Sequence, residues 1–232
     1  MSPKAVLFDF SGTLFRVEPA KRWLRAVLDA AGIGAGDAAI ARYAAALERA
    51  GALPGGAFPE RVPEALAEVW RTRDRSMERH RTAYTALARL VALPWPDGVY
   101  DALYERHMTP AAWQPYPDAG DVLRGLRERD VRVGVVSNIG WDPRPVFRAH
   151  GLDDHVDAYT LSYEHGVQKP DARLFRAACE ALAQAPQDVL MVGDDLRADG
   201  GAAALGCGYF PVDHLPVGER PDGLRPVLGL VG

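Results

Sequence analysis

Hydrophobic and polar positions divide this chain into stretches with different patterns. Residues 5–10, AVLFDF, form a short apolar run that ends at Ser-Gly, which is typical of a buried strand. From about residue 17 to residue 113 no comparable run follows. Ala-, Leu- and Arg-rich segments with helical spacing predict about four or five helices there instead, at residues 21–32, 37–51, 63–70, 77–93 and 97–107.

After Pro117 the pattern alternates between strands and helices. It predicts strands at residues 131–138, 155–163, 188–194 and 207–213, helices at residues 118–130, 170–184 and 196–206, and a further helix opened by Asp142-Pro143. Asp118 is the expected N-cap of the first of these helices. Strands that alternate with helices of this length imply right-handed crossovers and a parallel sheet covered on both faces.

The domain organisation follows from where the first strand finds its partners. Parallel neighbours for residues 5–10 lie only beyond residue 117, so the helical stretch is an insertion in an α/β core. We expect residues 1–16 and 113–232 to form the core and residues 17–112 to form an all-helical module. The tail from Leu215 onward, rich in Pro and Gly, is expected to wrap the surface as irregular chain.

Composition narrows the class of protein. The chain has 232 residues, of which 48% are hydrophobic and 25% charged, which is ordinary for a globular protein. The formal net charge of −4 argues against a nucleic-acid partner. No apolar run approaches a membrane span of about 18 residues and no signal-peptide pattern opens the chain, so we expect a cytoplasmic protein without a membrane partner. Cys179 and Cys207 are expected to be ordinary buried thiols.

Polar residues that could take part in catalysis or metal binding follow the predicted strands. Each alone is explained more simply as a turn residue, a helix cap or a surface lysine. Because ligands of parallel sheets bind outside the carboxyl ends of the strands, residues at several strand ends should converge on one pocket. Along the chain they are Asp9 and Ser11, Ser137 and Asn138, Lys169, and Asp194 and Asp195.

A divalent cation suits this set of residues. The carboxylate of Asp9 and that of Asp194 or Asp195 would repel each other unless a cation lay between them. An oxygen-only set without His or Cys suits Mg²⁺, which bridges to phosphate. A metal beside a hydroxyl group and Lys169 makes a phosphate-binding environment, in which Asp9 can attack phosphorus and form an aspartyl-phosphate that water then hydrolyses.

Four segments in this order resemble the motifs of the haloacid dehalogenase superfamily: DFSGTLF, VVSN, the KP of GVQKPDARLF, and GDDLRAD. The similarity extends over nearly the whole chain, and the inserted helices resemble that superfamily's helix-bundle cap. It implies a Rossmann-like three-layer α/β core with an all-α cap, and a Mg²⁺-dependent phosphatase acting on a small phosphorylated metabolite. It specifies neither the substrate, since phosphoglycolate, sugar phosphates and nucleoside monophosphates all fit, nor whether the protein is a monomer or a homodimer.

The resemblance also implies two overlapping groups of site residues. The metal group is Asp9, which is also the nucleophile, the carbonyl of Ser11, and Asp194, with Asp195 or Asp199 in support. The phosphoryl-binding group is Ser137 and Lys169, with N–H groups around Gly12, Thr13 and Asn138 helping. Lys169 also stands out by itself, because 24 of the 27 basic residues are arginines and a lysine supplies a compact point charge rather than a planar fork.

Ser11 departs from the usual pattern of phosphatases in this superfamily. They usually carry Asp two residues after the nucleophile, where it serves as acid to the leaving group and base to the attacking water. Such help is typically worth about 10²–10⁴ in rate, and a serine hydroxyl cannot match it. Some members with phosphatase activity resemble this chain in having Ser there. We expect slower turnover, a better leaving group, or a water or cap residue in this role.

Two other functions stay open. A metal-independent 2-haloacid dehalogenase also lacks the second Asp, but its fourth motif lacks the acidic pair Asp194-Asp195. A weakly catalytic binding or regulatory module would explain Ser11, but Asp9, Lys169 and Asp194 are all present. Dependence of activity on Mg²⁺ separates the phosphatase from the first alternative, and loss of activity in Asp9→Asn separates it from the second.

The expected cap contains the charged segment RTRDRSMERHR at residues 71–81. It either recruits an anionic substrate or forms a solvated helix face with charge pairs such as Asp74–Arg75, and we favour the second. Phe15 and Trp23 are placed near the pocket, and prolines near residues 16–19 and 112–117 predict hinges. Other aromatic residues are expected to pack within the cap: Trp70, Tyr84, Trp95, Tyr100 and Tyr104.

Overall fold

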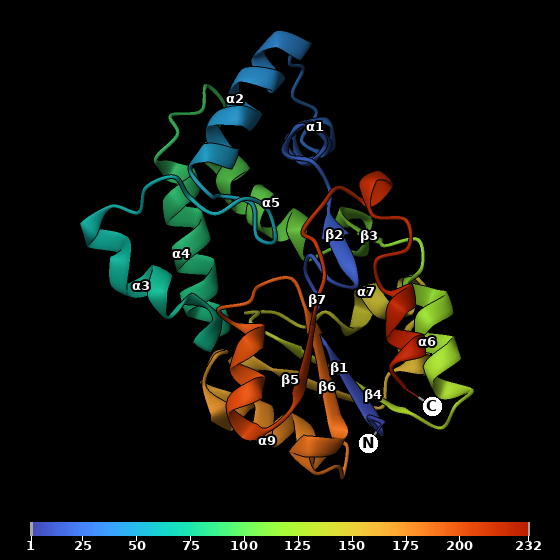
Figure 1. Ribbon diagram of the computed structural model, residues 1–232. Coiled ribbons are helices and arrows are strands. Elements are labelled where there is room, and N and C mark those ends of the chain that lie inside the picture. The colour runs from blue at the N-terminus through green and yellow to red at the C-terminus, as the bar shows by residue number, and fades with distance from the viewer. Residues whose placement is uncertain (1, 232) are drawn as a thin grey trace.

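The computed structural model describes residues 2–231, whose strands and helices are shown in Figure 1. The strands are β1 (Ala5–Phe8), β2 (Phe15–Val17), β3 (Trp113–Pro115), β4 (Arg132–Ser137), β5 (Ala158–Leu161), β6 (Val189–Gly193) and β7 (Gly208–Pro211). The helices are α1 (Ala20–Ala30), α2 (Asp37–Arg49), α3 (Ala67–Arg71), α4 (Met77–Arg89), α5 (Gly98–His107), α6 (Ala119–Arg127), α7 (Arg144–Ala149), α8 (Ser162–His165) and α9 (Ala172–Ala181).

The core is a five-stranded parallel sheet in the order β5-β4-β1-β6-β7. The first strand lies at its centre, and Leu7 is opposite Gly134 of β4 and Met191 of β6. Every residue of β1 is buried, as the continuous apolar run predicted for a strand covered on both faces. The prediction of an α/β fold with a parallel sheet is therefore confirmed.

Alternate residues of β1 face two different apolar layers. Val6 and Phe8 belong to the larger core cluster, which includes residues of α6 and α7. Ala5 and Leu7 belong to the second cluster, with Leu174 and Phe175 of α9 and the two buried cysteines. This period of two is the strand repeat, and it places helices on both faces of the sheet.

The helices α1 to α5 lie beyond the carboxyl ends of the strands (Figure 1), and apolar residues of α1, α2 and α5 belong to the same core cluster as Val6 and Phe8. The chain enters this module through β2 and leaves through β3, and these two short strands pair antiparallel with Phe15 opposite Pro115. The predicted domain limits at residues 17 and 112 fall within or beside this two-stranded ribbon. Phe15 and Trp23, expected to face the pocket, are instead fully buried in the apolar core.

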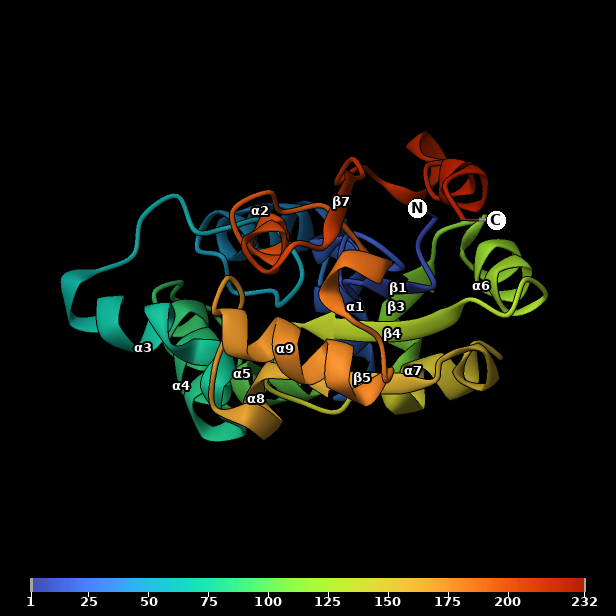
Figure 2. The ribbon, with the colours of Figure 1, turned by 60° about the horizontal axis from the view of Figure 1, so that its bottom comes forward.

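Other predicted elements differ from the structure in detail. The helix expected at residues 196–206 is a 3₁₀ helix at Asp199–Leu205. Asp118 is the N-cap residue of α6, as predicted, but its side chain makes no capping hydrogen bond: its Oδ2 accepts instead from the backbone N–H groups of Leu224 and Arg225, at 2.7 and 3.0 Å. The C-terminal tail is therefore anchored beside α6, as Figures 1 and 2 show, with short 3₁₀ turns in an otherwise irregular course. Within residues 2–231, no helix combines the length and the apolar character that crossing a membrane requires.

Candidate active site

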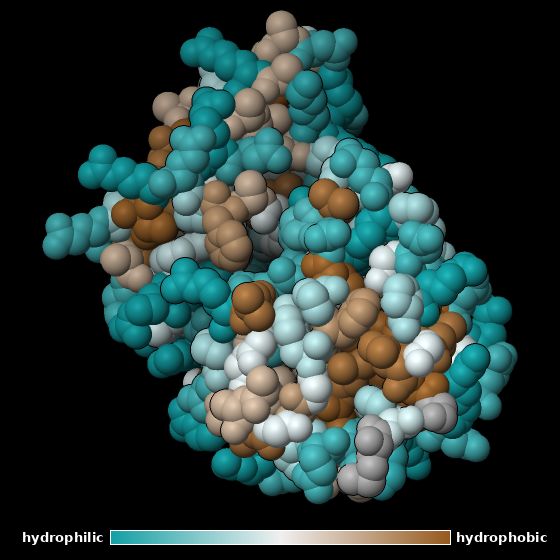
Figure 3. Space-filling view, in the orientation of Figure 1, coloured by the Kyte–Doolittle hydropathy of each residue, from teal (hydrophilic) through white to brown (hydrophobic). Residues whose placement is uncertain are grey.

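A cavity of about 890 Å³ lies between the cap helices and the carboxyl ends of the core strands. Figure 3 shows the surface hollowed between these two parts of the molecule. Most of the residues predicted at strand ends meet there: Asp9, Ser11, Ser137, Asn138, Lys169, Asp194 and Asp195. Gly12, Thr13 and Asp199 lie behind this wall.

Lys169 is the positive centre of the site. Its Nζ lies 2.8 Å from Oδ1 of Asp9 and 2.6 Å from Oδ1 of Asp199, and it donates to the carbonyl of Val136 at 3.0 Å. Burial alone would lower the pKa of Lys169, but the charges of Asp199 and Asp9 outweigh it and raise that pKa above its usual value. The ammonium group therefore stays charged and fixes the carboxylate of Asp9.

Asn138 positions Lys169 through the backbone. Its side-chain oxygen accepts from the N–H of Lys169 at 2.6 Å, and its side-chain nitrogen donates to the carbonyl of Lys169 at 3.0 Å. Both ends of the amide are thus used in holding the lysine loop against the end of β4. The side chain of Ser137, the last residue of β4, is 2% exposed and lines the cavity, where its hydroxyl can reach a ligand.

Three carboxylates converge beside the ammonium group. Oxygens of Asp9, Asp194 and Asp199 lie within 4.8 Å of one another. Burial raises the pKa of Asp9, Lys169 opposes that shift, and the charge of Asp194 adds to it. Burial also raises the pKa of Asp199 to about 7 against the pull of Lys169. Three acids stand against one ammonium group, and their oxygens could hold a hard cation; this oxygen-only donor set fits Mg²⁺.

Asp195 contributes to the loop rather than to this cluster. Its Oδ1 accepts from the backbone N–H groups of Arg197 and Ala198 at 2.8 and 3.2 Å, as a capping carboxylate does. Its own N–H donates to Oδ2 of Asp199 at 3.1 Å. Of the two residues proposed to support the metal, Asp199 is the one whose side chain joins Asp9 and Asp194.

Gly12 and Thr13 hold Asp194. The hydroxyl of Thr13, which is fully buried, donates to Oδ1 of Asp194 at 3.1 Å. Gly12 has a φ of +84°, and a Cβ there would lie 2.3 Å from Oδ2 of Asp194, so both conformation and space require glycine. The N–H of Gly12 donates to the carbonyl of Phe15 at 2.7 Å. The N–H of Gly12 is thus used within the loop, and the phosphate contact of the Thr13 N–H stays a prediction.

His214 is a site residue that the sequence reasoning missed. Its Nδ1 forms a hydrogen bond with Oδ2 of Asp194, and its Nε2 contacts Nη1 of Arg16, which also donates to the carbonyl of Gly55 at 2.8 Å. A neutral imidazole protonated on Nδ1 satisfies both contacts, because Arg16 can only donate. His214 follows β7, so the rule that ligands collect at the carboxyl ends of strands, applied to the last strand as well, would have found it.

The cap side of the cavity corrects two predictions about the inserted module. Arg73, Asp74 and His80 line the cavity, so part of the segment 71–81 faces the site rather than solvent. Asp74 contacts Arg73 and His80, not Arg75 as predicted. Trp70 and Tyr84 also line the cavity, whereas Trp95 packs on Tyr43, Tyr104 on His80, and the hydroxyl of Tyr100 donates to the carbonyl of Val91.

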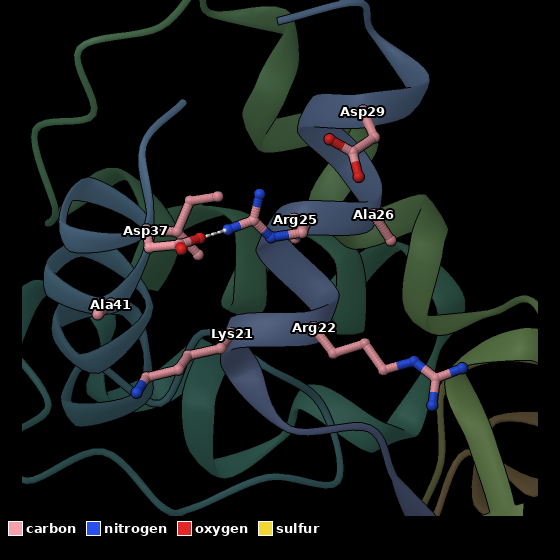
Figure 4. A pocket seen from close by; sticks show the side chains of 8 residues that line it. Lys21, Arg22, Arg25, Ala26, Asp29, Asp37 and Ala41 are labelled. Atoms are coloured by element: carbon pink, nitrogen blue, oxygen red, sulfur yellow. Dashed lines mark hydrogen bonds and ion pairs between the residues drawn. The ribbon is translucent and has the colours of Figure 1, made fainter. Parts of the chain in front are cut away.

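A second cavity, of about 630 Å³, lies between α1 and α2 of the cap. Figure 4 shows Arg25 of α1 paired with Asp37 of α2 across it, while Arg22 points away. Both partners of this pair are at least two-fifths exposed, and the cavity contains no convergent set of buried polar groups among its lining residues. The interdomain cavity is therefore the candidate active site.

Arg220 ties the C-terminal tail to the loop that carries Asp9. The buried guanidinium donates to the carbonyls of Gly12 (2.7 Å) and Thr13, and it stacks on the ring of Tyr116 at 3.2 Å from the centroid. We expect Arg220→Ala to lower the free energy of unfolding by about 2–3 kcal/mol, because buried carbonyls lose a charged donor. Denaturant unfolding measures this, with the exposed Arg225→Ala as control. Equal midpoints for the two variants would contradict the assigned contact.

Comparisons with known proteins point to one family. A family model described as haloacid dehalogenase-like hydrolase matches residues 3–206. A haloacid dehalogenase-like hydrolase domain-containing protein 3 from Mus musculus is 35% identical over 124 residues, which cover 53% of this chain and 48% of that protein. The chain thus spans about half the length of the curated relatives that it matches first.

Two further similarities extend over most of the chain. A phosphoserine phosphatase from Thermus thermophilus is 33% identical over 212 residues, which cover 90% of this chain and 73% of that protein. The crystal structure of a HAD phosphatase from Thermococcus onnurineus superposes with a TM-score of 0.57 at 26% identity, and the match covers 90% of this chain and 86% of that one. The sequence relatives and the fold therefore point to the same family.

Proposed function

We propose that this chain, which belongs to the haloacid dehalogenase-like hydrolase family, is a Mg²⁺-dependent phosphatase that hydrolyses small phosphomonoesters through an aspartyl-phosphate on Asp9. Membership of that family makes the chain a hydrolase, and the phosphoserine phosphatase among its relatives supports the phosphatase type. The observation that carries the proposal is the position of Asp9, held by Lys169 beside two further carboxylates at the floor of a capped cavity.

Each residue has a chemical role in this proposal. The carboxylate of Asp9 attacks phosphorus, and the ester oxygen leaves on the opposite side, toward the cap. Lys169 reduces the repulsion between the attacking carboxylate and the phosphoryl oxygens. Ser137 donates its hydroxyl to one of those oxygens. Bound among Asp9, Asp194 and Asp199, Mg²⁺ would supply further positive charge to the phosphoryl group.

The cavity also bears on the two alternative functions. A metal-free dehalogenase would have to keep three converging acids beside a single ammonium group, which electrostatic repulsion opposes. A binding module would have no need for a carboxylate fixed at 2.8 Å from a buried lysine. The geometry favours the phosphatase over both.

Metal dependence is the experiment that tests the proposal. On a panel of alkyl, aryl and acyl phosphates, we expect turnover with Mg²⁺ and a loss of at least about 10²-fold when EDTA removes the metal, because charge neutralisation at the phosphoryl group is lost. Added Mg²⁺ should restore the rate, whereas Ca²⁺, which takes more ligands at longer distances, should not. Release of halide from 2-chloropropionate in EDTA, without phosphatase activity, would support the dehalogenase instead.

A further inference from the structure

We propose that Asp74 of the cap is the acid–base group of the reaction, in the role that Ser11 cannot fill; this inference rests on the proposed function. Asp74 lies in the 3₁₀ helix Arg73–Arg75. It is 3% exposed and lines the same cavity as Asp9 and Ser11. Among the cavity-lining residues of the inserted cap, from Leu53 to Tyr84, it is the one carboxylic acid.

The position of Asp74 is fixed by the core rather than by the cap alone. The hydroxyl of Ser162 donates to the carbonyl of Asp74 at 2.6 Å and accepts from the N–H of Ile139 at 2.9 Å. The next residue, Gly140, packs so closely on His80 that a Cβ there would lie 2.2 Å from the Cβ of His80. This part of the cap is therefore locked onto the loop that follows Ser137, one of the residues proposed to hold the phosphoryl group.

The surroundings of the Asp74 carboxyl suit exchange of a proton. Nε of Arg73 lies 3.4 Å from Oδ2, and Nε2 of His80 lies 3.7 Å from Oδ1. Burial lowers the pKa of His80 well below its usual value, so the imidazole is neutral and adds no charge. Burial raises the pKa of Asp74, Arg73 and Lys169 oppose this, and Asp9 supports it. The carboxyl thus holds a proton closer to neutral pH than an exposed aspartic acid does.

Arg73 is itself held in place, and its charge only partly opposes the rise in the pKa of Asp74. Its guanidinium stacks on the ring of Trp70 at 4.0 Å and donates to the carbonyl of Trp70 at 2.9 Å. Burial raises the pKa of the neighbouring phenol of Tyr84, which therefore stays neutral. Arg73 is then the cation in direct contact with Asp74, and its Nε is 3.4 Å away, longer than a hydrogen bond in good geometry.

The cap also approaches Ser11 closely, through the loop that contains Gly55. Gly55 packs on Ser11, and a Cβ at Gly55 would lie 2.7 Å from Oγ of Ser11 and 2.6 Å from the ring of Trp113. The side chain of residue 11 therefore lies close to the cap, and the carboxylic acid that the cap itself brings to the cavity is Asp74.

The proposed steps balance in atoms and charge. As Asp9 forms its bond to phosphorus and the ester P–O bond breaks, Asp74 gives its proton to the departing oxygen, which leaves as the alcohol. The Asp74 carboxylate then takes a proton from a water molecule that attacks phosphorus from the vacated side. The bond between phosphorus and Asp9 breaks, inorganic phosphate forms, and Asp74 is protonated again for the next cycle.

Asp74→Asn, compared across leaving groups, tests this proposal. Protonation of the leaving group speeds the departure of an alkoxide greatly and that of dinitrophenolate little. We therefore expect the rate on an alkyl phosphate to fall about 10²–10⁴-fold. On dinitrophenyl phosphate, the variant should release one equivalent of dinitrophenol in a burst within about tenfold of the wild-type rate, and then stall, because water attack has lost its base. Asp74→Glu should recover much of the alkyl phosphatase rate, and the exposed Asp101→Asn should behave like the wild type.

Three outcomes distinguish the possible failures. If Asp74→Asn slows both substrates equally without a burst while Asp74→Glu is as impaired, Asp74 only holds the cap and the proposal is overturned. If Asp74→Asn turns over the alkyl phosphate normally, the proposal is also overturned. If the wild type itself hydrolyses neither ester with Mg²⁺, or Asp9→Asn remains active, the proposed function fails first. Inhibition by inorganic phosphate, unchanged in Asp74→Asn, shows that the site is intact in that variant.

Discussion

Asp9→Asn is expected to lose phosphatase activity by about 10⁴-fold or more while folding normally, because the amide keeps the shape of the carboxylate and cannot attack phosphorus. Burial raises the pKa of Asp9, so the ionised group costs stability in the folded protein at neutral pH. Without metal, the variant should therefore unfold at a denaturant concentration equal to or above that of the wild type. Steady-state assays and denaturant unfolding measure the two effects.

The exposed Asp222→Asn serves as the matched control for Asp9→Asn. It should leave both activity and unfolding unchanged. Activity above about a hundredth of wild type in Asp9→Asn would remove Asp9 from the role of nucleophile. A large fall in its unfolding midpoint would show instead that the ion pair with Lys169 stabilises the folded protein.

Lys169→Met is expected to lose both activity and stability. Removing one partner of a buried charge cluster typically costs about 3–5 kcal/mol, because the remaining charges are left uncompensated. Here Asp9 and Asp199 lose their ammonium partner. The pKa values of both are already raised, so without Lys169 the two carboxyls bind protons still more readily. The loss of stability should therefore be largest at neutral or higher pH and shrink as the pH falls below about 7.

Denaturant unfolding of Lys169→Met at two pH values, one near 8 and one near 5, measures this dependence. Lys21→Met, at an exposed position of α1, controls for the loss of a lysine. If both variants unfold alike at both pH values, the charge cluster around Lys169 does not contribute to stability. If Lys169→Met keeps wild-type activity, the lysine does not act on the phosphoryl group.

Much of the core was predictable because it rests on local patterns. The run at residues 5–10 indicated a buried strand, and its parallel partners had to come after the helical insertion. Strand ends then placed Asp9, Ser137 and Asp194 at one edge of one sheet. These inferences need only the alternation of elements and the direction of the strands.

The details that were wrong depend on long-range packing. The segment after Asp195 is a 3₁₀ helix, and a Cβ at Gly201 would lie 2.6 Å from Pro170, a residue of a distant loop. Likewise Asp74 contacts Arg73 and His80 because its 3₁₀ turn is packed against the core, and the spacing of charges along the chain does not reveal this. A local sequence pattern does not show which residue of another helix, strand or loop a side chain will contact.

The pairing of β2 with β3 means that the two connections to the cap are one joint rather than two. Each is hydrogen-bonded to the other, so neither can turn without carrying its neighbour. Asp74 is also tied to the core, through the hydroxyl of Ser162. A cap that turned about this joint would first have to break that hydrogen bond, and it would then carry the proposed acid away from Asp9.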